Sequence, residues 1–201
     1  MAVSKQVGAD RIMEAAACGA EIFGENYAQE LRDKFELVAD GTGHTVKWHF
    51  IGRLQRNKVK YLVGNVELIH SLDSVSVAEE IQKRAGAAGI KKVHALIEVN
   101  TAEEESKGGV VPNELGEFIS ELSRYESLSV DGLMTMAPYF DDPESARPYF
   151  RRLREMRDGL VETFGSLTEL SMGMSGDFEV AVEEGATLVR IGSAIFGERQ
   201  Y

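Results

Sequence analysis

The residues with the clearest chemical potential lie near the two ends of the chain. Two turns rich in small residues, Gly173–Gly176 and Ile191–Ala194, each follow a short apolar run. A charged residue, Arg190, lies within the second run, and Lys5 ends the apolar start M-A-V-S-K. These residue types suit an anion-binding loop, a buried cation and an amine nucleophile.

The two turns predict a phosphate cradle. Without bulky side chains, their backbone N–H groups can approach a ligand closely. The first turn also opens a segment with helical spacing, Asp177 to Glu184, and the N-terminal N–H groups of a helix favour an anion. The alternative is an ordinary pair of strand-to-helix turns, for which Gly and Ser are common choices.

Arg190 interrupts the apolar run Leu188–Ile191. A buried arginine is costly unless it has a partner. A structural ion pair with one of the many carboxylates is one explanation, and contact with a ligand at the end of a strand is the other.

Apolar segments and segments with helical spacing alternate eight times, with one unit every ~25 residues. This alternation predicts an α/β fold with a parallel sheet, closed as a (β/α)8 or TIM barrel that residues 1–201 form as one domain. A doubly wound open sheet is the alternative, although eight strands would be many for so short a chain. The expected strands are residues 1–5, 21–26, 46–51, 66–72, 92–100, 128–136, 167–172 and 187–191, and the expected helices are residues 9–18, 27–38, 53–64, 75–88, from 112 onward, 144–163 and 177–184.

Closure of the barrel would place the first strand beside the eighth. Lys5 would then lie at the same mouth as Arg190 and Ser193. Burial and neighbouring cations lower the pKa of a lysine amine, which makes Lys5 a candidate Schiff-base lysine. A solvated lysine at a strand end is the alternative.

A lysine, a phosphate cradle and an arginine together fit pyridoxal 5′-phosphate (PLP), whose ring nitrogen needs an acid or an arginine as its partner. Arg190 is placed for that role. An arginine keeps its own proton, so the ring would be a weak electron sink, suited to restricted chemistry or to none.

The overall charge argues against a nucleic-acid partner. The formal net charge is −11 over 201 residues, and such a field repels a phosphate backbone. The single cysteine, Cys18, excludes an intramolecular disulfide and a cysteine-based zinc site. Because we find neither a secretory signal nor an apolar stretch of ~20 residues, we expect a cytoplasmic protein without a membrane partner.

A set of motifs in the same order resembles the YggS/PROSC family, the pyridoxal phosphate homeostasis proteins. The motifs are A-V-S-K, F-G-E-N-Y, H-F-I-G-R-L-Q-R-N-K, E-E-S-K-G-G, G-L-M-T-M, S-M-G-M-S-G-D and V-R-I-G-S-A-I-F-G-E-R. The resemblance spans nearly the whole chain. It implies a barrel like the N-terminal domain of alanine racemase (PLP fold type III), with PLP bound by a lysine.

The resemblance also implies a role for seven residues. Lys5 matches the Schiff-base lysine and Arg190 the arginine that faces the pyridine nitrogen. The phosphate and ring positions are matched by Ser175, Gly192, Ser193, the backbone of Met174, and Asn26. His49 lies in a family motif without a settled orientation, and Lys107 matches a family lysine near the mouth.

Two departures from the family pattern are visible. Family members usually carry a helix before A-V-S-K, whereas Met1 stands there in this chain, so we expect a barrel without that helix. The continuation after Lys5 is Q-V-G, which lacks the second lysine that the family usually has.

These observations favour a PLP carrier that buffers the cofactor and yields it to apo forms of PLP-dependent enzymes, and we expect a monomer. The first rival is an amino-acid racemase, which needs a second base on the opposite face of the substrate. Tyr27, His49 and Tyr139 are the loose candidates for that base. The second rival is a barrel that binds a phosphate ligand and never forms a Schiff base.

Overall fold

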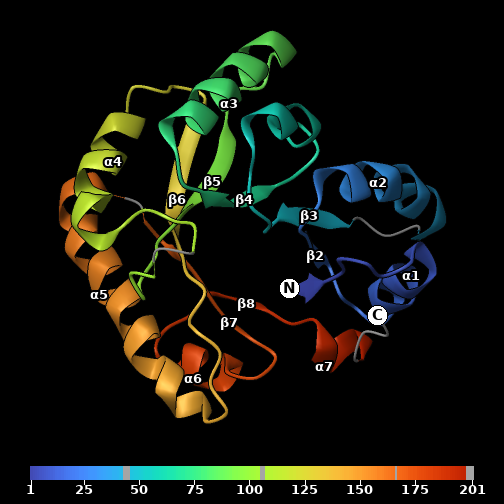
Figure 1. The fold of residues 1–201 in the computed structure, drawn as a ribbon. Coiled ribbons are helices and arrows are strands. Elements are labelled where there is room, and N and C mark those ends of the chain that lie inside the picture. The colour runs from blue at the N-terminus through green and yellow to red at the C-terminus, as the bar shows by residue number, and fades with distance from the viewer. Residues whose placement is uncertain (43–45, 105–106, 166, 198–201) are drawn as a thin grey trace.

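A computed structural model describes residues 1–42, 46–104, 107–165 and 167–197. Eight strands form one sheet in chain order, and each strand pairs in parallel with the next (Figure 1). The strands are β1 (Ala2–Val3), β2 (Ile22–Glu25), β3 (Lys47–Phe50), β4 (Leu68–Leu72), β5 (Val93–Glu98), β6 (Leu128–Met134), β7 (Glu169–Met174) and β8 (Leu188–Arg190).

The last strand returns to the first and closes the sheet. Ala2 and Ile191 form a parallel bridge. The Val3 N–H donates to the Ile191 carbonyl at 2.7 Å, and the Ile191 N–H donates to the Met1 carbonyl at 3.1 Å. The predicted (β/α)8 barrel is therefore confirmed, and the open doubly wound sheet is wrong.

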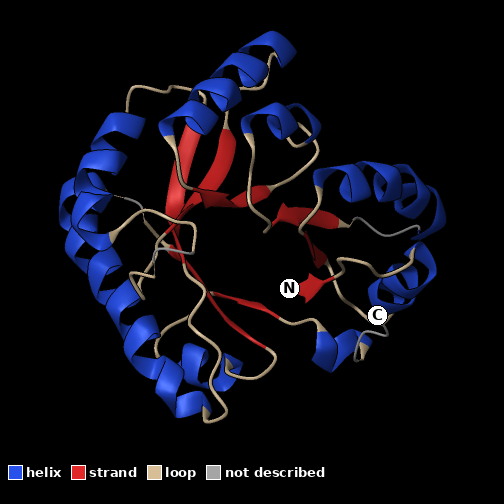
Figure 2. Cartoon of the chain, viewed as in Figure 1, coloured by secondary structure: helices blue, strands red, loops and turns tan. Residues whose placement is uncertain are grey.

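Helices surround the strands as an outer ring (Figure 2). Helical segments lie in the connections between successive strands, as in the βαβ units of a parallel sheet. The α-helices are α1 (Ala9–Ala17), α2 (Ala28–Thr42), α3 (Val75–Ala88), α4 (Leu115–Leu122), α5 (Arg147–Phe164), α6 (Phe178–Glu183) and α7 (Ser193–Phe196), and the 3-10 segments are η1 (Arg56–Tyr61), η2 (Pro112–Glu114) and η3 (Pro143–Ala146).

The basic segment after β3 differs from its prediction. We expected a helix over residues 53–64, whereas the regular part is the 3-10 segment η1. Val59 and Leu62 are both fully buried, and a spacing of three residues aligns side chains on a 3-10 helix better than on an α-helix. Burial of this pair fixes the end of the segment against the core, and the spacing is compatible with the 3-10 winding.

Helix α3 matches its predicted bounds because its start, face and end are all encoded locally. Val77, Ala78, Ile81 and Ala85 are buried on one face, at the spacing of an amphipathic helix. Gly89 ends the helix with a φ of 68°, a conformation that glycine adopts without strain.

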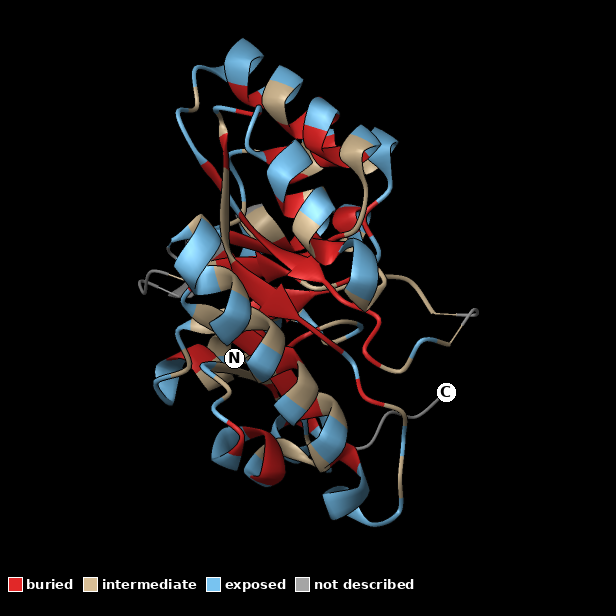
Figure 3. Cartoon of the chain, turned by 90° about the vertical axis from the view of Figure 1, so that its left-hand side faces the viewer, coloured by how far each residue is buried: buried red, intermediate tan, exposed pale blue. Residues whose placement is uncertain are grey.

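The hydrophobic core fills the barrel and the layer beneath the helices. Figure 3 shows the strands as largely buried and the outer faces of the helices as exposed. Phe23, Phe50, Ile69 and Leu96 are each at most 1% exposed. None of the helices in the described ranges is long and apolar enough to cross a membrane.

Candidate functional site

A cavity of about 940 Å³ opens at the C-terminal ends of the strands, around β1 and β8. This volume lies within the usual range for a small-molecule site. The structure brings all seven predicted residues to its wall, namely Lys5, Asn26, Met174, Ser175, Arg190, Gly192 and Ser193. The predicted convergence of β1 with the two C-terminal turns is thus present in the fold.

The charges at the cavity wall favour an anion. Lys5, Arg11 and Arg190 line it, and Asp177 is the one acidic residue among its described lining residues. Arg11 also donates to the Phe196 carbonyl at 2.7 Å, which ties α1 to the short helix α7. A cationic cavity within a chain of net charge −11 is a local concentration of positive potential.

The two glycine-containing turns meet at Ser175. Its Oγ accepts the Gly192 N–H at 3.2 Å and the Ala194 N–H at 3.4 Å. N–H groups of the second turn thus point at the first turn, as a shared phosphate cradle requires. The Met174 N–H donates to Asp177 Oδ1 at 2.6 Å, so this N–H group already has an acceptor inside its own turn.

Gly173 shows why the first turn needs glycine. Its φ is +89°, and a Cβ at this position would lie 2.5 Å from Ala181 Cβ. The turn therefore brings the end of β7 against α6 more closely than any other residue would permit.

Asn26 presents an unused acceptor. Its Oδ1 is buried and has no hydrogen-bond partner among the described residues, and Asn26 is one of the residues that line the cavity. A buried polar atom without a partner is uncommon in native structures. A ligand with a hydrogen-bond donor at this position would complete it.

Arg190 is held by neutral groups. Its guanidinium donates to Ser171 Oγ at 2.7 Å and to the Thr135 carbonyl at 2.8 Å. Of the two explanations for Arg190, the structural ion pair is not found, since the partners of its guanidinium among the described residues are a hydroxyl and a carbonyl. Burial lowers the pKa of Arg190 to about 10, against the opposing effect of Glu98 and Asp177, so the side chain remains charged at neutral pH.

A buried chain of hydrogen bonds extends from Arg190 into the barrel. Ser171 Oγ lies 2.8 Å from His70 Nδ1, and His70 Nε2 lies 2.9 Å from His49 Nδ1. Because an arginine can only donate, Ser171 Oγ accepts from Arg190, and its second lone pair and its own proton allow the bond to His70 in either direction. The histidine tautomers set the directions of the Ser171–His70 and His70–His49 bonds.

Both histidines are neutral in this arrangement. Burial lowers the pKa of His49 to about 4, and burial together with the charge of Arg190 lowers the pKa of His70 well below its usual value. The sequence analysis missed His70 and Ser171. Their only signal is a polar residue inside an otherwise apolar strand, which is ambiguous without its partner.

Three further predicted residues lie elsewhere. His49 faces His70 and is not among the described lining residues of the cavity, and neither are Tyr27 and Lys107. Lys107 pairs with Glu104 at 2.9 Å. Its neighbours Glu105 and Ser106 in the E-E-S-K-G-G motif lie outside the described residues, as do the last two residues of the V-R-I-G-S-A-I-F-G-E-R motif. Tyr139 does line the cavity, with 88% of its surface exposed.

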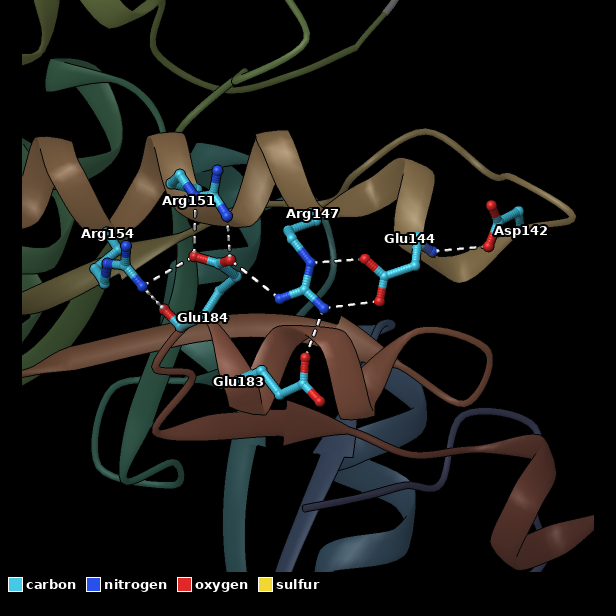
Figure 4. Close-up of polar contacts among 7 residues, drawn as sticks. All are labelled: Asp142, Glu144, Arg147, Arg151, Arg154, Glu183 and Glu184. Atoms are coloured by element: carbon cyan, nitrogen blue, oxygen red, sulfur yellow. Dashed lines mark hydrogen bonds and ion pairs between the residues drawn. The ribbon is translucent and has the colours of Figure 1, made fainter.

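The arginine-rich helix α5 forms ion pairs that converge on the end of α6 (Figure 4). Glu184, directly after α6, lies 3.1 Å from Arg147 and 2.9 Å from both Arg151 and Arg154. Arg147 also contacts Glu183 at 2.5 Å. The network fastens α6, and with it the turn that carries Ser175, to the long helix α5.

Comparison with known proteins places the chain among cofactor-binding barrels. The family model described as alanine racemase, N-terminal domain, matches residues 1–200. A protein of Aquifex aeolicus (strain VF5) named pyridoxal phosphate homeostasis protein is 52% identical over 202 residues, which cover 100% of this chain and 87% of that protein.

Solved structures agree with the fold. PipY of Synechococcus elongatus PCC7942, solved with PLP bound, is 35% identical with a TM-score of 0.89, covering 98% of this chain and 91% of that chain. Alanine racemase of Clostridium difficile 630 is 18% identical with a TM-score of 0.78 and covers 100% of this chain and 52% of that chain. At that identity the likeness concerns the barrel alone.

Proposed function

The chain belongs to the alanine racemase N-terminal domain family, among the pyridoxal phosphate homeostasis proteins, and from this premise we propose that it binds PLP in the cavity at the mouth of its barrel. The observation that carries the proposal is the meeting of Lys5, Arg190 and the two small-residue turns at one cavity. When bound, the cofactor supplies an aldehyde that a lysine amine can attack with release of water, and a ring that withdraws electrons.

Lys5 is the proposed point of attachment. Lys5 would hold the cofactor through its side-chain amine, which would condense with the aldehyde with release of water. Lys5 and Arg190 line the same cavity as the turn at Ser175, so one ligand with an aldehyde and a phosphate can reach all three.

Arg190 is the proposed partner of the ring nitrogen. Two of its five N–H donors are used by Ser171 and Thr135, and others remain to donate toward a ligand. Because Arg190 keeps its proton, the ring nitrogen stays unprotonated and withdraws electrons weakly. This property favours holding the cofactor over turnover.

Ser175, Gly192 and Ser193 are the proposed phosphate contacts, with Met174 beside them and Asn26 toward the ring. The proposal for Ser175 rests on the N–H groups that converge on its hydroxyl, because converging backbone donors suit a phosphate oxygen. We propose a carrier and buffer of PLP in the cytoplasm, monomeric, formed by residues 1–201 as one unit, with apo forms of PLP-dependent enzymes as recipients.

Absorption spectroscopy tests the proposal. The purified protein is mixed with PLP, desalted and scanned beside a Lys5→Ala variant. We expect the parent to retain the visible band of lysine-bound cofactor and the variant to lose it. Borohydride reduction followed by mass spectrometry should place the added mass on the peptide that contains Lys5. A parent without the band would disprove attachment to this lysine.

The racemase alternative has a narrower basis. Tyr139 is the one candidate for a second base that lines the cavity, and its high exposure leaves its hydroxyl in solvent. Exchange of the α-hydrogen of L-amino acids for deuterium, followed by NMR, separates the two functions. A carrier gives no exchange above that of free PLP.

A further inference from the structure

An ionic cluster holds the backbone on both sides of Lys5. The Ser4 carbonyl, which precedes Lys5, accepts from Lys34 Nζ at 2.7 Å. The Gln6 N–H, which follows it, donates to Glu30 Oε1 at 2.5 Å. The two peptide groups that flank the Cα of Lys5 are therefore both fixed by side chains of α2 and not by the barrel strands alone.

Lys34 is the centre of this cluster. Its Nζ donates to the Ser4 carbonyl at 2.7 Å, to Glu25 Oε1 at 2.8 Å and to Glu30 Oε1 at 2.6 Å. An ammonium group has three N–H donors, so each one has an acceptor. The side chain of Lys34 is 10% exposed, and a lysine this deeply buried is retained only when it is fully paired.

Glu25 ties the cluster to the barrel wall. It ends β2, and its Oε1 also accepts the Ser4 hydroxyl at 2.6 Å. Burial raises the pKa of Glu25, while its bonds to Lys34 and Ser4 act in the opposite direction. Ser4 is thus held through both its hydroxyl and its carbonyl, immediately before Lys5.

The backbone after Lys5 needs this support. Gln6 has a φ of 59°, a left-handed conformation that is unfavourable for a residue with a Cβ. Such conformations persist when the surrounding structure fixes them, and they gather at functional sites. Glu30 supplies that restraint through the Gln6 N–H, and the chain continues along the cavity wall through Val7 and Gly8.

We propose that Lys34 and Glu30 are positioning residues that orient Lys5 for attack on an aldehyde. This inference rests on the proposed function, because it assigns Lys5 as the attacking amine. A fixed backbone confines the Lys5 side chain to fewer directions, so its amine is presented more often within reach of the reacting carbon. Neither positioning residue lines the cavity, so both act through the Lys5 backbone.

Two ligands separate positioning from general damage. PLP carries the aldehyde, and 4′-deoxypyridoxine 5′-phosphate has the same ring and phosphate without it. The affinity of each is measured, by absorption for PLP and by calorimetry for the analogue, in the parent, Lys34→Met, Glu30→Ala and Arg84→Met. Arg84 is the matched control, since it pairs with Glu80 at 2.6 Å with the same i,i+4 spacing on α3, away from the cavity.

We expect Lys34→Met and Glu30→Ala to weaken PLP binding by about tenfold or more, with an unchanged affinity for the analogue and no effect of Arg84→Met. Equal weakening of both ligands, or no change for either, would overturn the inference. If Lys34→Met does not fold, Glu30→Ala carries the test, because Glu30 is partly exposed and its removal leaves Lys34 paired with Glu25 and the Ser4 carbonyl. A parent that never forms lysine-bound cofactor would overturn the proposed function itself.

Discussion

Two ionic clusters support the two halves of the cavity, and they are built differently. The first, which we call the lysine clamp, consists of Lys34, Glu25, Glu30 and Ser4 and lies behind Lys5. The second, the arginine network, joins α5 to the C-terminal end of α6 (Figure 4), and α6 follows the turn that carries Ser175. Both connect a site-bearing segment to the helix packed outside it.

The difference lies in burial and redundancy. In the lysine clamp one cation serves two carboxylates, and the side chains of Lys34 and Glu25 are 10% and 0% exposed. In the arginine network three arginines share Glu184, and the side chain of Arg151 is 51% exposed. Water can replace a lost contact in the network, whereas a lost charge in the clamp leaves its partner buried alone.

The largest effect is expected from Lys34→Met. Removing one partner of a buried ion pair typically lowers the free energy of unfolding by about 3–5 kcal/mol, because the other charge stays desolvated. Urea unfolding followed by circular dichroism measures it.

The double variant Lys34→Met, Glu25→Gln is the control. It should recover part of the loss, since removing both charges also removes the desolvation penalty. A double variant that is as unstable as the sum of the single variants would show that packing, and not charge, explains the first result.

The buried His49–His70 pair extends the comparison to neutral groups. The pKa of His49 is lowered to about 4 from 6.5. Between these two pH values the unfolded chain therefore binds a proton at His49 that the folded chain does not bind. The stability that this provides is complete above pH 6.5 and is lost as the pH falls toward 4. The loss should amount to about 3 kcal/mol.

Carboxylates with a raised pKa oppose this slope. Burial, followed by the charge of Asp73, raises the pKa of Glu98 to about 7, so its contribution falls as the pH rises through the same range. The test is therefore the difference between the parent and His49→Gln, whose amide can accept from His70 without titrating. That difference should grow from pH 4 to pH 6.5, and parallel curves would contradict the assignment.

An intermediate effect is expected from Glu184→Gln. Glu184 is the shared acceptor of three arginines, so a neutral amide weakens several charge-assisted bonds at once. The expected decrease in the free energy of unfolding is about 1–2 kcal/mol. Chemical unfolding measures this decrease. A decrease in the free energy of unfolding as large as that of Lys34→Met would contradict the proposed difference between the two clusters.

The smallest effect is expected from Arg151→Ala. Arg147 and Arg154 still contact Glu184 in this variant, and solvent already screens the exposed guanidinium. We expect a thermal midpoint within error of that of the parent, recorded by differential scanning fluorimetry. A clear decrease would show that the network has less redundancy than its geometry indicates.

Local sequence patterns were sufficient to predict much of the fold and to propose much of the candidate site. The alternation of apolar runs with helical segments predicted the barrel, and the bounds of α3 followed from its spacing and from Gly89. Lys5, Arg190 and the turn at Ser175, which line one cavity, could be proposed from the sequence because lysine, arginine and small residues have distinctive chemistry at strand ends. Family motifs added Asn26, whose buried acceptor the structure then revealed.

What the sequence alone determined about this protein is therefore the order of its elements and the residue types at the barrel mouth, because spacing of 2, 3.6 or ~25 residues is a local property. Only the tertiary structure decided which polar groups meet in the interior. Ser4 and Glu25 are 21 residues apart in the chain, and His70 and Ser171 are 101 apart. Such pairs leave no periodic signal, since closure of the barrel and packing of α2 bring them together.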